Sequence, residues 1–84
     1  MKIVCLSISR GTLLQTISVY DLSEDKKSLV PIEIKKCDYN NIIKEAIATC
    51  EDFDTKIIKC NNKGTEEWFK NKGYILLDDV LKGE

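Results

Sequence analysis

Four cysteines are the residues best suited to chemistry in this chain, because a thiolate can act as a nucleophile or bind a soft metal. They are Cys5, Cys37, Cys50 and Cys60, and no two of them form a Cys-x-x-Cys pair. In a reducing compartment a free cysteine usually packs as a small apolar side chain. We therefore expect Cys5 and Cys50 to be structural. Cys37 and Cys60 are candidate metal ligands, and an iron–sulfur cluster is the cofactor that thiolates would suit.

The chain contains no histidine. This removes the commonest general base at neutral pH and the commonest nitrogen ligand of transition metals. Classical catalytic triads and zinc-hydrolase motifs are thereby excluded. A nucleophile at Cys37 or Cys60 would have no histidine to activate it, so we expect no catalytic residues and no enzymatic activity.

Length and composition indicate one small domain that spans residues 1–84. Apolar residues make up 43% of the chain and charged residues 32%, and no apolar run approaches the roughly 18 residues of a membrane span. The net charge of −1 gives no long-range attraction to phosphate, so nucleic acid is not an expected partner. Polar residues soon interrupt the first apolar segment, which argues against a secretory signal and predicts a cytoplasmic protein.

Three segments in the first half of the chain have the alternation that is typical of strands. Residues 2–9 are apolar on both alternating sets, which indicates a central strand. Residues 15–22 alternate polar and apolar side chains and indicate a half-buried strand. Residues 29–36 alternate again. Pro31 predicts that this third strand lies at a sheet edge, because proline cannot donate a hydrogen bond to a neighbouring strand.

The second half of the chain alternates between helical and strand-like patterns. A helix is predicted where apolar residues recur with helical spacing after an N-cap at Asp38 or Asn40. These apolar residues are Ile42, Ile43, Ala46, Ile47 and Cys50. Residues 55–60 and residues 74–77 are the fourth and fifth predicted strands.

A second, shorter helix is predicted over residues 65–72, between the last two strands. Thr65 is its expected N-cap. Trp68 and Phe69 lie in this segment, and we expect both rings to pack onto the sheet because aromatic side chains bury large apolar areas. After Leu77 the chain has room for one further helical turn.

These elements predict an α/β fold with a five-stranded mixed sheet in the order 3-2-1-4-5. Short connections make the first three strands antiparallel, whereas the helical crossovers require the fourth and fifth strands to be parallel to the first. Right-handed crossovers then place both helices on one face of the sheet. The other face would carry only the C-terminal turn. We expect a second copy of the chain or another protein to shelter the apolar residues there.

The C-terminal ends of the parallel strands would share one rim, where ligands of open α/β sheets tend to bind. The segment from Asn62 to Thr65 leads into a helix N-terminus, which could hold an anion. Other polar residues expected on the rim are Ser9, Lys36, Asn61, Asp78 and Asp79. The candidate binding residues are Arg10, Cys37, Cys60, Asn62 and Gly64.

The layout of nearly the whole chain resembles ribonuclease-H-like domains, and among them the NifX-type carriers of nitrogenase iron–molybdenum cofactor biosynthesis. The resemblance rests on Met1-Lys2-Ile3-Val4, on Ile17-Ser-Val-Tyr-Asp-Leu22 with the acidic turn after it, and on the later strand–helix–strand unit with Gly64 and Lys72-Gly73-Tyr74. It implies binding of an iron–sulfur cluster precursor without turnover of a substrate. Only Arg10 and Gly64 carry over from the family's pattern. Ser9-Arg10-Gly11 stands where the family has His-Phe-Gly-Arg, and Cys60-Asn61-Asn62 replaces a double glycine.

Two functional hypotheses follow. The first is a small non-enzymatic carrier that binds a metallocluster or an anion at the rim. The alternative is a protein-interaction module, or a small regulator or inhibitor, that uses the open sheet face or the edge strand with Pro31. A nuclease is not expected, because residues 2–9 and 55–60 hold no carboxylates for two-metal catalysis.

Overall fold

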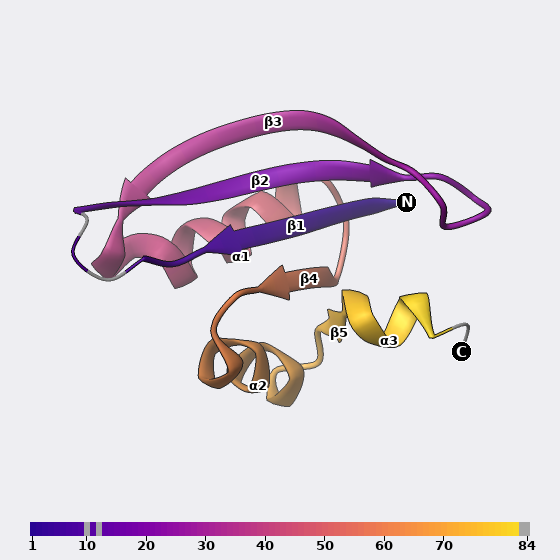
Figure 1. Ribbon diagram of the computed structural model, residues 1–84. Coiled ribbons are helices and arrows are strands. Elements are labelled where there is room, and N and C mark those ends of the chain that lie inside the picture. Colours follow the sequence, from indigo (N-terminus) through magenta and orange to yellow (C-terminus); the bar gives the residue numbers. More distant parts are fainter. Residues whose placement is uncertain (10, 12, 83–84) are drawn as a thin grey trace.

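The protein forms a five-stranded mixed sheet in which the strands lie in the order β3-β2-β1-β4-β5 (Figure 1). The computed structural model describes residues 1–9, 11 and 13–82. The strands are β1 (Lys2–Ser7), β2 (Leu14–Leu22), β3 (Leu29–Asp38), β4 (Ile57–Cys60) and β5 (Ile75–Leu76). β2 runs antiparallel to β1 and β3, whereas β4 is parallel to β1 and β5 is parallel to β4. The predicted strand order and the mixed character of the sheet are confirmed.

β1 is the central strand because its side chains are apolar on both faces. Val4 is buried on one face and Ile3 on the other. In the sheet Val4 lies opposite Val19 of β2 and Ile58 of β4, so three neighbouring strands contribute to one core layer. Burial on both faces also fixes the register, because a slip of one residue would turn every side chain to the wrong face.

Two helices share one face of the sheet. α1 (Ile42–Asp52) follows the short 3-10 helix η1 (Tyr39–Asn41), and α2 (Lys63–Asn71) connects β4 to β5. Their buried side chains join the core layer of β1, β2 and β4; they are Ile42, Ala46, Cys50 and Phe69. The predicted placement of two helices on one face is confirmed by this shared core. Within the described residues, no helix combines the length and apolarity needed to cross a membrane.

A third helix, α3 (Leu77–Leu81), covers part of the opposite face. Leu77 packs with Ile3 and Leu22 in a second, smaller buried cluster. The Nζ of Lys26 donates a hydrogen bond to the carbonyl oxygen of Val80 at 3.2 Å. α3 lies against β4 and β5, whereas β3 lies at the opposite edge of the sheet (Figure 1). The cover that α3 provides is therefore confined to one end of this face.

The beginning of α2 differs from the prediction. The helix starts at Lys63, and its N-cap is Asn62, whose Oδ1 accepts a hydrogen bond from the backbone N of Thr65 at 3.0 Å. Thr65 was expected to be the N-cap itself. The sequence is ambiguous here because Asn and Thr both cap helices, and the Asn side chain reaches the third residue of the helix as the motif requires.

The fifth strand is also shorter than predicted. It ends at Leu76, because α3 begins at Leu77. Asp78 and Asp79 therefore lie in the first turn of α3 and not at the end of a strand, as the prediction of the rim required. The carboxylate of Asp78 instead pairs with Lys59 of β4 at 3.3 Å.

Trp68 and Phe69 do not share a role. Phe69 is fully buried, whereas 39% of Trp68 is exposed. Phe69 meets the rings of Trp68 and Tyr74 edge-on, with centroids 5.0 Å and 5.1 Å away. Consecutive residues on a helix point about 100° apart, so only one of the two could face the sheet squarely. The expectation that Trp68 is a core residue was wrong.

Candidate functional site

At the rim where β1 and β4 end, the side chain of Asn61 forms the hydrogen bonds that a further residue of a strand would form. The carboxamide of Asn61 accepts a hydrogen bond from the backbone N of Ile8 and donates one to its carbonyl oxygen, both at 2.9 Å. The backbone N of Asn61 also donates to the carbonyl oxygen of Leu6 at 3.4 Å. The pairing of β1 with β4 therefore continues beyond Ser7, the last residue of β1, through a side chain.

A second carboxamide holds the next residue of this rim. The backbone N of Ser9 donates to Oε1 of Gln15 at 2.5 Å, and Nε2 of Gln15 donates to the carbonyl oxygen of Ser9 at 3.2 Å. Gln15 lies on β2 and is buried, and a buried amide is stable only when it is hydrogen-bonded. The backbone of Ile8 and Ser9 is thus fixed by two side chains, that of Asn61, which follows β4, and that of Gln15 on β2. Arg10, the next residue and a candidate binding residue, lies outside the described residues.

The start of α2 is closed by acceptors from the chain itself. Asn62 Oδ1 accepts hydrogen bonds from the backbone N and the hydroxyl of Thr65, and Glu66 Oε2 accepts one from the backbone N of Cys60 at 3.1 Å. A Cβ at Gly64 would lie 3.3 Å from Asn62 Oδ1, so glycine leaves room for this cap. The carboxylate of Glu66 already brings negative charge to the positive end of the helix dipole. The backbone N of Thr65 is thus already hydrogen-bonded to Asn62, whereas a phosphate-binding loop leaves such N–H groups free for the ligand.

The two candidate metal ligands lie on different strands. Cys60 ends β4, Cys37 lies in β3, and β2 and β1 run between these strands. Three strand spacings correspond to about 14 Å, which is more than a single metal ion can bridge. Within the described part of the chain, no three His, Cys, Asp or Glu side chains gather in an arrangement that could hold a metal. Cys60, Asn62 and Gly64 are brought together at the rim, and Cys37 is not.

The surroundings of both cysteines favour the neutral thiol. Burial raises the pKa of Cys60, although hydrogen bonds, first that from the backbone of Asn62, oppose this in part. Burial also raises the pKa of Cys37, and the carboxylate of Glu45 adds to the effect. Because the thiolate is the form that binds metals and attacks electrophiles, neither residue is activated by its environment.

β3 presents a long and exposed edge. It has ten residues, and β2 is its one neighbouring strand within the described part of the chain; all of its residues except Lys35 and Cys37 are exposed. Between 44% and 63% of each of four large apolar side chains is exposed; they are Leu29, Val30, Ile32 and Ile34. An edge strand also leaves one row of backbone N–H and C=O groups without a neighbouring strand. This edge therefore offers both apolar contact and main-chain hydrogen bonds to another polypeptide.

The two halves of β3 differ in how well they are protected against such pairing. The register shifts between Val19 and Tyr20 of β2, which lie opposite Glu33 and Pro31, so Ile32 is an extra residue that forms a bulge. A bulge and a proline both hinder the addition of a further strand. Both lie in the first half of β3, whereas the pairing with β2 is regular from Glu33 to the end of the strand.

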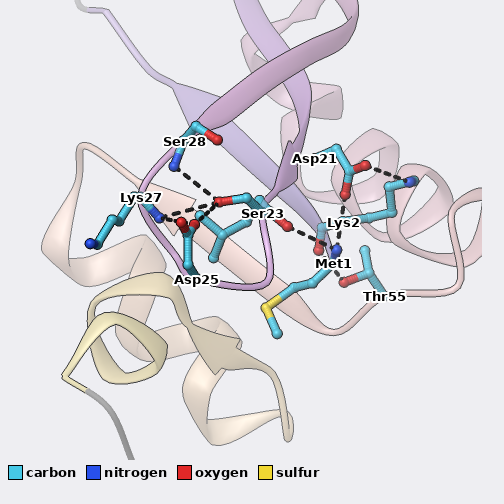
Figure 2. Close-up of polar contacts among 9 residues, drawn as sticks. Met1, Lys2, Asp21, Ser23, Asp25, Lys27, Ser28 and Thr55 are labelled. Carbon is cyan, nitrogen blue, oxygen red and sulfur yellow. Dashed lines mark hydrogen bonds and ion pairs between the residues drawn. The ribbon is translucent and has the colours of Figure 1, made fainter.

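A compact polar network braces the turn that joins β2 to β3 (Figure 2). The hydroxyl of Ser23 accepts hydrogen bonds from the backbone N of Lys27 at 3.3 Å and of Ser28 at 3.2 Å, and donates to Asp25 at 2.5 Å. The carboxylate of Asp25 also accepts a hydrogen bond from the backbone N of Lys27 at 3.1 Å. The hydrogen bond from Ser23, and after it that from Lys27, lower the pKa of Asp25. Lys26 in the same turn has a φ of 62°, in the left-handed region. The turn holds the two strands as a fixed hairpin, so the edge of β3 is presented in one orientation.

A shallow cleft lies between this turn and α3. Its volume is about 190 Å³, and it is lined by Leu22, Lys26, Lys27, Ser28, Leu29, Leu77 and Leu81. Pockets that bind small molecules usually enclose roughly 300–1,000 Å³. The cleft is therefore smaller than a typical ligand site.

The sequence did not indicate the part played by Gln15. The available signal was its position, because Gln15 alternates with Ile17 and Val19 and so belongs to the inward-facing set of β2. A glutamine in an otherwise apolar set predicts a buried amide with a specific hydrogen-bonding partner. Asn61 was expected on the rim, but its two hydrogen bonds to Ile8 depend on an exact approach of the chain that no spacing rule supplies.

No protein-family model, no curated protein and no solved structure matches the chain.

Proposed function

We propose that the protein is a small protein-interaction module that binds another polypeptide along the edge of β3. The observation that carries this proposal is the exposure of a ten-residue edge strand with four large apolar side chains in water. A strand added there would satisfy the outward-facing backbone groups and remove apolar surface from water. The braced turn after β2 supports the proposal, because a fixed edge loses little conformational entropy when it binds.

One double variant tests the role of the edge directly. Ile32→Lys combined with Ile34→Lys places two charges on β3, and both residues are exposed, so the core is not disturbed. Leu13→Lys is the matched control, because Leu13 is an 89% exposed apolar residue outside β3. We expect tagged wild-type protein and the control variant to capture the same partner, and the edge variant to lose it.

The readout needs a second measurement that reports on the edge itself. Hydrogen exchange should slow at the backbone amides of β3 when the captured partner is added back, and remain unchanged on α2. Equal capture by all three proteins, or protection confined to another surface, would overturn the proposal. Circular dichroism of the variants confirms that each is folded.

A carrier of the NifX type with a ribonuclease-H-like fold is the second candidate. One observation favours it: Cys60 pairs with Leu6 at the C-terminal ends of β1 and β4, the point where open α/β sheets tend to bind ligands. It ranks second because the thiol is buried and the described residues place no group of three potential ligands around it. Anaerobic purification with iron analysis and visible absorbance tests it. A colourless protein that also takes up no cluster from iron and sulfide would eliminate this function.

A further inference from the structure

We infer that the strand added to β3 is β3 of a second copy of this chain, paired antiparallel in one register centred on Ile34. The inference rests on the proposed function, because it uses the same edge, but it goes further by naming the partner and the alignment.

Charge complementarity selects the register. When a two-fold axis perpendicular to the sheet passes beside Ile34, each Glu33 lies opposite Lys35 of the other copy, so two pairs of opposite charge form. An axis beside Glu33 would instead set two carboxylates opposite each other, and an axis beside Lys35 would set two ammonium groups together. Opposite charges directly across a strand pair stabilise it and like charges destabilise it. Among these three registers, only the one centred on Ile34 is attractive.

The structure leaves both charged groups able to take part. Glu33 and Lys35 lie on the same face of the sheet, opposite Val19 and Ile17 of β2. Among the described residues, the carboxylate of Glu33 has no ion pair or hydrogen bond. The Nζ of Lys35 is 3.7 Å from the carboxylate of Glu45 on α1, a loose contact that leaves donors for a second carboxylate.

The opposite face of the sheet adds an apolar contact on the axis. Ile34 lies opposite Ser18 of β2 and is 63% exposed, and in this register it would meet Ile34 of the second copy. The bulge at Ile32 and the proline at position 31 then fall at the ends of the paired segment. The segment is short, so the buried area lies at the low end for protein interfaces and the dimer should be weak and reversible.

Sedimentation over micromolar to millimolar concentrations provides the first test. We expect wild-type protein to dimerise reversibly, and Glu33→Lys and Lys35→Glu each to raise the dimer dissociation constant by about ten-fold or more, because two attractions become two repulsions. An equimolar mixture of the two variants should form a heterodimer, since the lysine introduced in one chain then faces the glutamate introduced in the other. Glu24→Lys makes the same change of charge in the turn and should leave dimerisation unchanged.

Disulfide crosslinking tests the register independently of charge. Ile34→Cys places two thiols on the axis, where directly opposite Cβ atoms are about 4.5–5.5 Å apart, close to the separation that a disulfide needs. Lys36→Cys keeps Glu33 and Lys35 but separates its two thiols by about 13 Å along the strands. Under mild oxidation we expect a crosslinked dimer through position 34 and none through position 36, with peptide mapping to exclude the native cysteines.

Two outcomes would overturn the inference. One is a wild-type protein that remains monomeric at millimolar concentration, and the other is a dimer that persists equally in both charge variants or crosslinks through position 36. Neither outcome would by itself overturn the proposed function. Loss of a different captured partner in the Ile32→Lys, Ile34→Lys variant would still establish strand addition at β3, whereas failure of that experiment together with a monomeric wild type would remove both.

Discussion

The side chain of Asn61 forms two hydrogen bonds of 2.9 Å with the backbone of Ile8, which lies 53 residues earlier in the chain. A single carboxamide thereby takes the place of one more residue of parallel pairing between β1 and β4. With Gln15 on the neighbouring strand, it fixes the backbone that leads out of the central strand. The side-chain amides of Asn61 and Gln15 thus determine the backbone path at this rim.

Replacing Asn61 with alanine should therefore lower the free energy of unfolding by about 1–2 kcal/mol, because two hydrogen bonds to the backbone of Ile8 are lost. Urea denaturation measures this change. Asn71→Ala is the control, since Asn71 is an exposed asparagine at the end of α2, and its effect should stay within about 0.5 kcal/mol. Equal stability of the two variants would contradict the importance of the Asn61 contacts.

The N-cap of α2 can be assigned by comparing two substitutions. Asn62→Ala should destabilise the protein by about 1 kcal/mol, because the cap accepts the hydrogen bond of the Thr65 backbone. Asn62→Ser should retain most of the stability. Thr65→Ala removes the hydroxyl contacts to Asn62 and Cys60 but keeps the capped backbone N–H, so its effect should be smaller than that of Asn62→Ala when both are measured by chemical denaturation. A larger effect at Thr65 would restore Thr65 as the cap.

The aromatic residues of α2 should differ sharply in their contribution to stability. Phe69→Ala removes a fully buried ring that contacts Trp68 and Tyr74, and it should lower the free energy of unfolding by about 3–5 kcal/mol. Trp68→Ala removes a ring that is partly exposed, and it should cost less than about half as much. Thermal and urea unfolding compare the two variants. A loss at Trp68 that equals the loss at Phe69 would show that Trp68 belongs to the core after all.

The four cysteines should react in two groups. Cys5 and Cys37 are partly exposed, whereas Cys50 and Cys60 are buried. Brief treatment with N-ethylmaleimide at neutral pH, followed by mass spectrometry of peptides, should label Cys5 and Cys37 first. Cys50 and Cys60 should become reactive only in denaturant. Preferential labelling of Cys60 in the native protein would indicate an activated thiol and would strengthen the carrier hypothesis.

Burial of Cys50 predicts a loss of stability at alkaline pH. Burial raises the pKa of this thiol from 9.0 to about 11 in the folded protein. Between these values the unfolded chain loses a proton that the folded chain keeps, so rising pH favours unfolding; below pH 9 the group has no such effect. The advantage in stability of wild type over Cys50→Ala should shrink by roughly 2 kcal/mol from pH 9 to pH 11. A difference that stays constant over this range would contradict the shift.

The strand order could be predicted because two residue patterns pointed to it independently. The apolar residues on both faces of β1 required a central strand, and Pro31 required an edge. The short turn before β2 and the helical crossovers then left one economical arrangement. The same order already implied that two strands separate Cys37 from Cys60, a consequence that the spacing of cysteines along the sequence does not display.

Other features depended on choices that the sequence leaves nearly balanced. Asn62 and Thr65 are both good caps, and Trp68 and Phe69 are both good core residues, so the packing of the helix decided between them. The end of β5 was decided by Leu77, which anchors α3 against Ile3 and Leu22. The hydrogen bonds of Asn61 depend on the distance to Ile8, which is 53 residues away in the sequence, and those of Gln15 depend on its distance from Ser9. Pattern and propensity do not determine such distances.

The two apolar layers of this sheet are unequal. One is assembled from several strands and two longer helices, while the other depends on the five residues of α3, in which Leu77 is buried and Val80 packs against the same cluster. Detachment of α3 alone would wet Ile3 and Leu22 and leave the thicker layer in place, so this opening should require less free energy than global denaturation. We therefore expect α3 to detach before the rest of the protein unfolds. The face of β1 that it covers would then be the first apolar surface accessible to proteases and chaperones.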